Sequence, residues 1–464
     1  MEKLIILIVL VTGVIALAQL VRVYELTSKL NNRGEHEITD RDNHLNAKLM
    51  LGFMLFQFIG FIYLMLKYGW TGRGEAASLQ GVETDWLLNL NFVIIIIVFF
   101  ITNFLLFFFA YKYVRKPGVK AMYYSHNNKL EAIWTVVPAV VLAVIIILGL
   151  QSWNELTSGP SKESEKIELF AKQFEWTARY SGEMNKLGKF DYKLTNEENN
   201  PLALMTAETI EASRVEMEKS IQSIDNELKM VQLDHLASGY RKLSRSSTYK
   251  QHIDTVYNEF SANEHFNLIE AEEGFKHVYG DHMGMKGHVE VEIPGPNAET
   301  QKIMDRLEDK LITKGRILRS IIQMKKTHDP KSDDNTWDDF IQSDTLFLCK
   351  GREYEFSFRS KDVLHSAYLP HFRAQMNVVP GMPTRFKFTP SLTSVEMRKK
   401  KADPKFNFIL MCNKICGTAH FKMKMIVVVL PKKEYQIWKT SKQANTFKNT
   451  YLNGEAEESS NTKN

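Results

Sequence analysis

The chain has 464 residues, of which 44% are hydrophobic and 24% are charged, and its formal net charge is +5. This length can hold more than one domain, and the modest charge gives no reason to expect a nucleic-acid partner. The average hydrophobic content conceals an asymmetry, because the long apolar runs all lie in the first third of the sequence. We therefore expect a membrane part followed by a soluble part.

Four apolar runs are long enough to cross a bilayer, which takes ~20 residues of α-helix. They cover residues 4–21, 49–66, 87–110 and 133–150. The first run could be a cleaved signal peptide, but no small-residue cleavage site follows it cleanly, which favours a retained helix. The loop 111–129 has no acidic residue and contains Lys112, Arg115, Lys116, Lys120 and Lys129. Because such basic loops face the cytoplasm, we expect both termini and the soluble part to lie outside.

The start of the fourth run carries a local motif. Residues 128–138 read NKLEAIWTVVP. This segment resembles the L-E-x-x-W-T-x-x-P pattern in the transmembrane hairpin of cytochrome c oxidase subunit II. The resemblance implies that 87–152 is this hairpin and that 1–86 adds two further helices with their loops. It also implies that Glu131 admits protons to a channel in the catalytic subunit, whereas a helix-start charge favoured by the helix dipole is the alternative.

Residues 167–176 read IELFAKQFEW and alternate as a strand should. They are similar to the first soluble strand of the same family, in which Q-W-x-W is typical. Phe174 replaces the first Trp of that pattern, and Trp176 keeps the second. The resemblance makes Trp176 a candidate for the electron path. Phe174 replaces the Trp that usually receives the electron in this family.

The stretch 181–339 leaves the family pattern. Apolar residues spaced by three and four, from Met217 to Val231 and from Ile303 to Ile321, predict two helices. We expect an antiparallel pair within a mainly helical insertion. A lid, a subunit contact or a lineage-specific addition would each fit it. One group of residues in the insertion could be a second metal site, but the glycines that interrupt it favour a flexible loop. The group consists of His277, Asp281, His282, Met283, Met285 and His288.

The strand pattern returns after the insertion. Alternating apolar residues follow from 347, and the run 425–430 is expected to close a barrel. By resemblance, 165–180 and 340–440 form an all-β, cupredoxin-like Greek-key barrel. We interpret Cys349 as a packed thiol and not a ligand. The polar residues 453–464 are expected to be a disordered tail.

The segment 412–423, CNKICGTAHFKM, concentrates metal-binding chemistry. Cys412 and Cys416 are followed by His420 and Met423, and thiolate, imidazole and thioether together select soft metals, copper above all. Two thiolates can bridge two copper ions, which shares an odd electron and favours fast electron transfer. A structural disulfide between Cys412 and Cys416 is the alternative, although it gives His420 and Met423 no role.

A second histidine precedes this loop, in the segment 362–366, DVLHS. The two segments resemble the CuA domain of cytochrome c oxidase subunit II, where C-x-E-x-C-G-x-x-H-x-x-M follows D-V-x-H-S. The resemblance implies that Cys412 and Cys416 bridge both coppers and that His365 and His420 each bind one. Met423 and the backbone carbonyl of Lys414 would complete the ligand set.

The resemblance implies the electron-entry subunit of a bacterial haem–copper respiratory oxidase, a proton-translocating oxidoreductase. A cytochrome c-type donor would reduce the two-copper CuA centre on the periplasmic side of the cytoplasmic membrane. The partners would be the catalytic subunit I, which holds the haems and CuB and reduces oxygen, and other oxidase subunits.

Two departures from the family pattern bear on these partners. Lys414 stands where the family has a magnesium-binding Glu, so we expect this magnesium to be absent or held without the side chain. Asn377 stands where the family turn often has Asp, and a basic run, which would otherwise be a solvated loop, covers 397–401. We therefore expect a tethered or acidic cytochrome as the donor.

The rival hypothesis is a membrane-tethered copper chaperone or thiol oxidoreductase with a C-x-x-x-C site. Such proteins usually have one span and a thioredoxin-like βαβ pattern around the cysteines. Strand-like sequence surrounds the cysteines here, and thiol exchange has no use for His420 or Met423. No C-x-x-C-H motif occurs in the sequence, so no c-type haem is expected on this chain.

Overall fold

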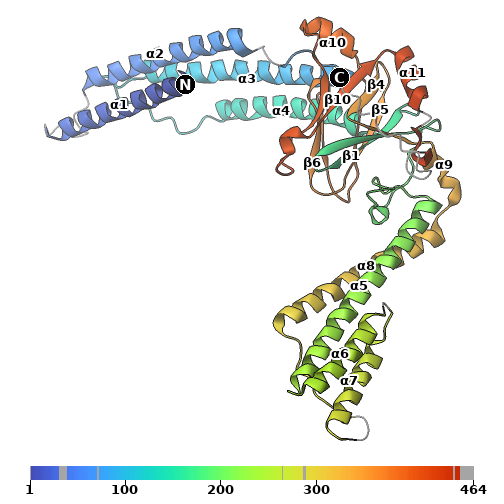
Figure 1. Ribbon diagram of the computed structural model, residues 1–464. Coiled ribbons are helices and arrows are strands. Elements are labelled where there is room, and N and C mark those ends of the chain that lie inside the picture. The colour runs from blue at the N-terminus through green and yellow to red at the C-terminus, as the bar shows by residue number, and fades with distance from the viewer. Residues whose placement is uncertain are drawn as a thin grey trace. The chain divides into compact units, whose positions relative to one another are not determined.

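The computed structural model describes residues 2–30, 39–69, 73–263, 265–285, 289–442 and 445–449. The chain divides into two compact units, whose elements are labelled in Figure 1. The first unit comprises Met1–Ala76 and Gly81–Glu155, and the second comprises Ala77–Gln80 and Leu156–Asn464. The first unit is helical, and the second combines a β-sheet domain with a helical insertion.

Long helices make up the first unit. They are α1 (Glu2–Leu30), α2 (Asp40–Leu64, extended by a π-turn at Met65–Gly69), α3 (Leu79–Lys112) and α4 (Asn128–Thr157). Within the described residues, three helices are long and apolar enough to cross a membrane: Asp40–Gly69, Leu79–Lys112 and Asn128–Thr157. They contain the second, third and fourth predicted runs. The first run falls within α1, where the side chains of residues 2–10 lie outside the described part.

Helix α2 packs on α3 through aromatic side chains. The rings of Phe58 and Phe61 lie 4.6–5.9 Å, centroid to centroid, from those of Phe99 and Phe100. Three of these four pairs are edge-to-face, and such pairs add ~1 kcal/mol each beyond the area they bury. The helix that the sequence adds before the hairpin is therefore fixed to the hairpin's first helix.

Two five-stranded sheets form the β-sheet domain. One has the order β3-β2-β1-β5-β8 and the other β4-β10-β9-β6-β7. The strands of the first sheet are β1 (Glu165–Lys172), β2 (Glu175–Tyr180), β3 (Phe340–Ser343), β5 (Tyr354–Ser360) and β8 (Thr384–Phe388). Those of the second are β4 (Thr345–Cys349), β6 (His365–Leu369), β7 (Ala374–Val378), β9 (Phe408–Cys412) and β10 (Lys424–Leu430). Apolar side chains from both sheets share one core, in which Cys349 is packed as expected.

Two details of the predicted strands were wrong. The segment 167–176 is not one strand, because the chain turns at Gln173 and Phe174 and β1 pairs antiparallel with β2. The reversal sets Trp176 opposite Ala171 and returns its ring to the core. Strand β10 lies inside the second sheet, between β4 and β9, and no ladder among the described strands joins the two sheets. A closed barrel is therefore not what these ladders form.

The basic run before the metal-binding segment lies in a helix and not in a solvated loop. Helix α10 (Ser394–Lys401) begins at Thr393, whose hydroxyl accepts from the amide of Glu396. The Glu396 carboxylate accepts from the amide of Thr393 in return, which is a capping box. Basic residues in its last turn are favoured by the helix dipole. A second helix, α11 (Lys432–Lys442), follows β10.

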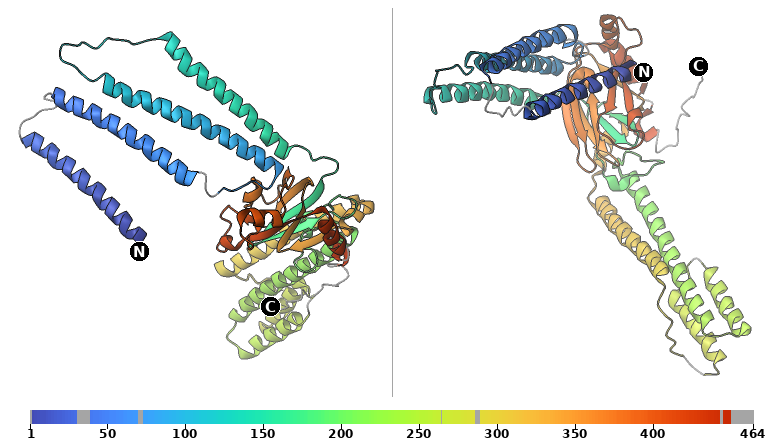
Figure 2. Two further views of the ribbon diagram at one scale, coloured as in Figure 1. Left: turned by 90° about the horizontal axis from the view of Figure 1, so that it is seen from above. Right: turned by 90° about the vertical axis from the view of Figure 1, so that its left-hand side faces the viewer.

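The insertion holds four long helices, not only the predicted pair (Figures 1 and 2). These are α5 (Ala207–Lys242), α6 (Ser247–Ser261), α7 (Leu268–His282) and α8 (Ala298–Thr327). Ile210 near the start of α5 packs with Ile321 near the end of α8, and Leu228 packs with Leu307, so the two helices run antiparallel. Helices α6 and α7 pack on the far end of α5 through a separate apolar cluster.

Buried charges join the base of the insertion to the first sheet. Arg179 at the end of β2 donates to Asp339 at 2.7 Å and to the carbonyl of Gly188 at 3.0 Å. Glu168 accepts from both Arg179 and Arg359. Such a network is tolerated in a core because each charge has a partner. Short elements complete this region: Tyr192–Leu194, Pro330–Ser332 and α9 (Asp334–Trp337).

Candidate metal centre

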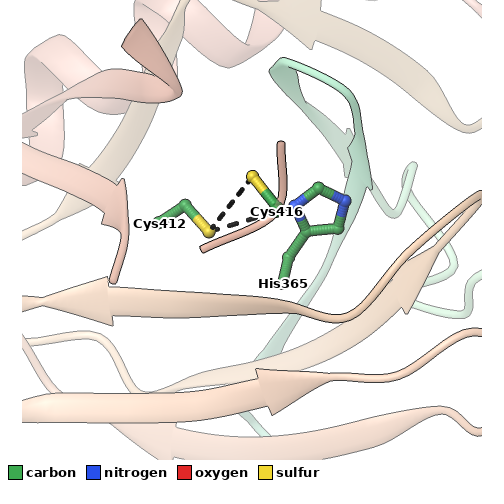
Figure 3. A group of neighbouring side chains, drawn as sticks. All are labelled: His365, Cys412 and Cys416. Carbon is green, nitrogen blue, oxygen red and sulfur yellow. Dashed lines mark hydrogen bonds between the residues drawn. The ribbon is translucent and has the colours of Figure 1, made fainter. Parts of the chain in front are cut away.

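Strands β6 and β9 set the framework of the candidate site. They pair antiparallel, with Ala367 opposite Cys412, so His365 at the start of β6 lies near Cys412 at the end of β9. Nδ1 of His365 is 3.9 Å from Sγ of Cys412, and the two cysteine sulfurs are 3.9 Å apart. Figure 3 shows the three side chains pointing toward one another. They are the group of candidate metal-binding side chains found among the described residues.

The other three predicted ligands gather around the same sulfurs. Nδ1 of His420 lies 3.4 Å from Sγ of Cys416, and Sδ of Met423 lies 3.8 Å from it. The carbonyl oxygen of Lys414 lies 3.1 Å from Sγ of Cys412. The short helix His420–Lys422 turns the chain between the last two side chains. The structure thus brings together all six groups that the sequence suggested.

Four residues of the cluster are shielded from water. His365 is fully buried, and Cys412, Cys416 and Met423 are 6%, 5% and 1% exposed. All three cysteines of the chain are free thiols, so the alternative of a disulfide between Cys412 and Cys416 does not hold. Burial, together with neighbouring Cys412, raises the pKa of Cys416 to about 11. A thiol with this pKa needs a nearby cation before it loses its proton at neutral pH.

Asp362 orients His365. Its Oδ1 lies 2.8 Å from Nε2 of His365. Partial burial alone would raise the pKa of Asp362, but hydrogen bonds from His365 and from the amides of Gln173 and Val363 hold it below its usual value. An ionised acceptor places the imidazole proton on Nε2, which leaves the Nδ1 lone pair facing Cys412.

The turn between β1 and β2 supplies contacts that we did not predict. The side-chain amide of Gln173 donates to the carbonyl of Cys416. A Cβ on Gly417 would lie 2.7 Å from this amide nitrogen and 2.9 Å from the Phe174 ring, and Gly417 has a φ of +143°. Only glycine fits both restrictions. The signal in the sequence was the similarity of Gln173-Phe174 to the start of Q-W-x-W, which by itself assigns Gln173 no contact.

Trp176 lies next to the cluster. Its side chain is 2% exposed, and its ring centroid is 6.2 Å from that of His365 in an edge-on arrangement. Its Nε1 is buried without a hydrogen-bond partner in the described structure. The proximity of an extended π-system to a candidate ligand fits the electron-path prediction without testing it.

Glu131 lies in the other unit, in the first turn of α4. Its carboxylate accepts from the amide of Asn127 at 3.2 Å and lies 4.0 Å from Nδ1 of His126. The Asn127 side chain in turn accepts from the amide of Leu130 at 3.0 Å. These bonds support the helix-start interpretation, because they satisfy backbone N–H donors that have no partner within the first turn of a helix.

The second cluster suggested in the insertion does not converge in the described residues. His277 faces Asp281 at 3.1 Å, while His282 faces the hydroxyl of Ser244 at 3.0 Å. His288 lies outside the described residues.

The donor set fits copper. Two buried thiols, two imidazole nitrogens and a thioether are soft or borderline ligands, and no carboxylate is among them, as calcium or magnesium would require. Each cysteine sulfur lies within 4 Å of one imidazole nitrogen.

Parts of the chain are similar to known proteins. Residues 69–152 match the family described as "Cytochrome C oxidase subunit II, transmembrane domain". The alternative cytochrome c oxidase subunit 2 of Bradyrhizobium diazoefficiens is 34% identical over 110 residues, which are 24% of this chain and 34% of the relative. Cytochrome c oxidase subunit 2 of Thermostichus vulcanus is 29% identical over 108 residues, 23% of this chain and 29% of the relative. The chain thus spans about a third of the length of these relatives.

Among solved structures, the periplasmic domain of subunit II of cytochrome oxidase (CoxB) of Bradyrhizobium japonicum is 21% identical. The similarity covers 21% of this chain and 62% of that chain, with a TM-score of 0.18.

Apolar helices that can span a membrane, joined in one chain to a two-sheet domain, define a membrane protein with a β-sheet domain. Residues 69–152 match the transmembrane domain of cytochrome c oxidase subunit II, and part of the chain is similar to curated subunits of that name.

Proposed function

We propose that this chain is the electron-entry subunit of a respiratory haem–copper oxidase and that residues 412–423 with His365 hold a two-copper CuA centre. The observation that supports this most is the convergence of four donor groups, from two separate segments, on the pair of cysteine sulfurs. When bound, copper supplies a one-electron couple at this position. The proposal includes a cupredoxin-like Greek-key ancestry for the two sheets.

The chain's own residues would perform three tasks in this function. Cys412 and Cys416 would hold both ions, because each sulfur lies within 4 Å of the other and of one imidazole. The buried sheets around them would exclude water, which lowers the rearrangement that accompanies a change of charge. Trp176, beside His365, would couple the centre to a partner's redox group.

The partners proposed are a catalytic subunit that holds the haems and reduces oxygen, other oxidase subunits, and a cytochrome c-type donor. A bacterial cytoplasmic membrane with the copper domain on its periplasmic side follows from the basic loop 111–129. Glu131, in the first turn of α4 beside that loop, is then on the cytoplasmic side. We propose that it admits protons to the catalytic subunit.

An acidic or tethered donor is supported by the surface of the metal-binding loop. Residues 413–424 contain three lysines and no acidic residue. Ile415 and Phe421 in the same loop are 86% and 76% exposed. An apolar patch bordered by positive charge suits a partner with carboxylates at its rim, because complementary charge accelerates encounter and like charge slows it. The proposed donor therefore differs from a basic soluble cytochrome.

The rival function, thiol exchange, is less well supported. The cysteines lie between strands β9 and β10, and the curated relatives named above are oxidase subunits. A metal titration separates the two functions. The purified full chain in detergent should take up two copper ions per chain. The number of thiols that react with a thiol reagent should decrease in proportion to the copper bound. Turnover of a disulfide substrate with no copper uptake would favour the rival.

A further inference from the structure

We infer that Gln173 is a positioning residue that ties the two halves of the metal centre together. The inference rests on the proposed function for the identity of the bound ions, but not for the contacts themselves. His365 is held by β6, whereas Cys416 belongs to the loop after β9. Gln173 comes from neither, since it lies in the β1–β2 turn of the other sheet.

The backbone of Gln173 contacts the histidine half of the centre. Its amide N–H donates to Oδ2 of Asp362 at 2.7 Å. The other oxygen of that carboxylate lies 2.8 Å from Nε2 of His365. A shift of the β1–β2 turn would therefore be passed through one carboxylate to the orientation of the imidazole, as outer-shell partners of metal ligands do.

The side chain of Gln173 contacts the thiolate half. Its Nε2 donates to the carbonyl oxygen of Cys416 and packs on Gly417. The sulfur of Cys416 lies within 3.9 Å of the donor atoms of Cys412, His420 and Met423. Fixing the Cys416 backbone thus fixes the sulfur on which these three distances depend.

The chemistry of the contact restricts the residue. A carbonyl acceptor requires a donor, so Glu at position 173 has the right length but presents an oxygen to an oxygen. Asn keeps the amide but is shorter by one methylene and cannot reach as far. Gln173→Glu is therefore the sharpest variant, and Gln342→Glu is its control. Gln342 on β3 makes the same kind of bond, which is exposed, to the carbonyl of Ser343 at 2.8 Å.

The first experiment needs no copper. The metal-free full chain in detergent is treated with a thiol reagent, and labelling of Cys416 and Cys349 is read separately by peptide mass spectrometry. Cys349 is packed in the core and reports whether the fold is intact. In Gln173→Glu we expect Cys416 to label about five-fold faster relative to Cys349, the factor for one ordinary hydrogen bond. In Gln342→Glu we expect no change. An unchanged ratio in Gln173→Glu would overturn the inference.

A second readout uses the copper-loaded chain. We expect Gln173→Glu to release copper to a chelator several-fold faster and to shift the reduction potential, which a merely structural role would leave unchanged. If wild type binds no copper, the proposed function fails, while the thiol ratio still tests Gln173. If wild type binds copper and both readouts of the variant match it, only the positioning role fails. Should Gln173→Glu disturb Cys349, Gln173→Asn is judged by the same ratio.

Discussion

Ala367 and Cys412 lie opposite each other in the ladder between β6 and β9, and this register decides where the candidate metal centre forms. One residue of slippage would turn the Cys412 side chain to the other face of the sheet. His365, two residues before Ala367, would then face no sulfur.

Lys414 should make the family's magnesium site ineffective. An ammonium cannot bind a cation, and a charge of one at 4 Å from a charge of two is repelled by about 2 kcal/mol even in water. In the assembled oxidase we expect wild type to give no signal from bound Mn²⁺, while Lys414→Glu gains one and both keep their copper. An Mn²⁺ signal in wild type that disappears in Lys414→Ala would contradict this account of the side chain.

Glu131 offers a clean separation of its two interpretations. In Glu131→Gln the side chain can still accept from the amide of Asn127, but it cannot release a proton. If Glu131 admits protons, Glu131→Gln and Glu131→Ala should both slow reduction of the haem–copper centre by about ten-fold or more, with copper reduction by the donor unchanged. If Glu131→Gln turns over normally and only Glu131→Ala is impaired, the helix-start role is sufficient.

The donor prediction is tested by rate and salt. Stopped-flow reduction should be faster with an acidic cytochrome c than with a basic one. The acidic reaction should slow as salt increases, because charges are screened over ~8 Å at 0.15 M. Lys422→Glu in the exposed loop should reduce this difference. Fast reduction by the basic cytochrome that falls steeply with salt would show that the docking surface is acidic.

His371 should make the β-sheet domain less stable in acid. Burial, with Lys401 and Arg373 nearby, lowers the pKa of His371 to about 4. The unfolded chain, with an ordinary pKa near ~6.5, binds this proton first. The contribution of neutral His371 to the free energy of unfolding is therefore fully present above about pH 6.5 and is lost as the pH decreases toward about 4. We expect a loss of about 1–2 kcal/mol after allowance for solvent screening of a half-exposed ring. His371→Gln should flatten the urea-midpoint profile over this range, and His252→Gln on exposed α6 should not. Identical profiles for wild type and His371→Gln would contradict the prediction.

The site was easier to predict than its surroundings because its ligands stand in two short segments. The spacing from Cys412 to Met423 is a local pattern, and the loop that follows β9 holds it together. The Gln173–Cys416 contact joins residues 243 positions apart and depends on how two sheets pack, which no local spacing encodes. The same holds for Arg179 and Asp339, whose pairing joins the two ends of the insertion.

Among the helices, too, those with a strong local pattern were predicted and those without one were missed. The apolar runs of α3 and α4 and the stripes of α5 and α8 predict helices because their periodicity is strong. Helices α6 and α7 were missed, since their buried faces rely on aromatic residues such as Tyr249 and Phe275 among many polar ones. The turn at Gln173 was missed because β1 and β2 are both strand-like, and alternation alone does not indicate where a chain reverses.

The most direct test of the proposed copper centre is the EPR spectrum of the copper-loaded full chain in its one-electron state. Wild type should show an unpaired electron split by two equivalent copper nuclei. Met423→Leu should keep that pattern with a changed potential, because a weak ligand tunes a site more than it secures the metal. Cys412→Ser should show an electron localised on one copper or no bound pair. A two-nucleus spectrum that persists in Cys412→Ser would contradict the bridging role of this thiolate and the account built on it.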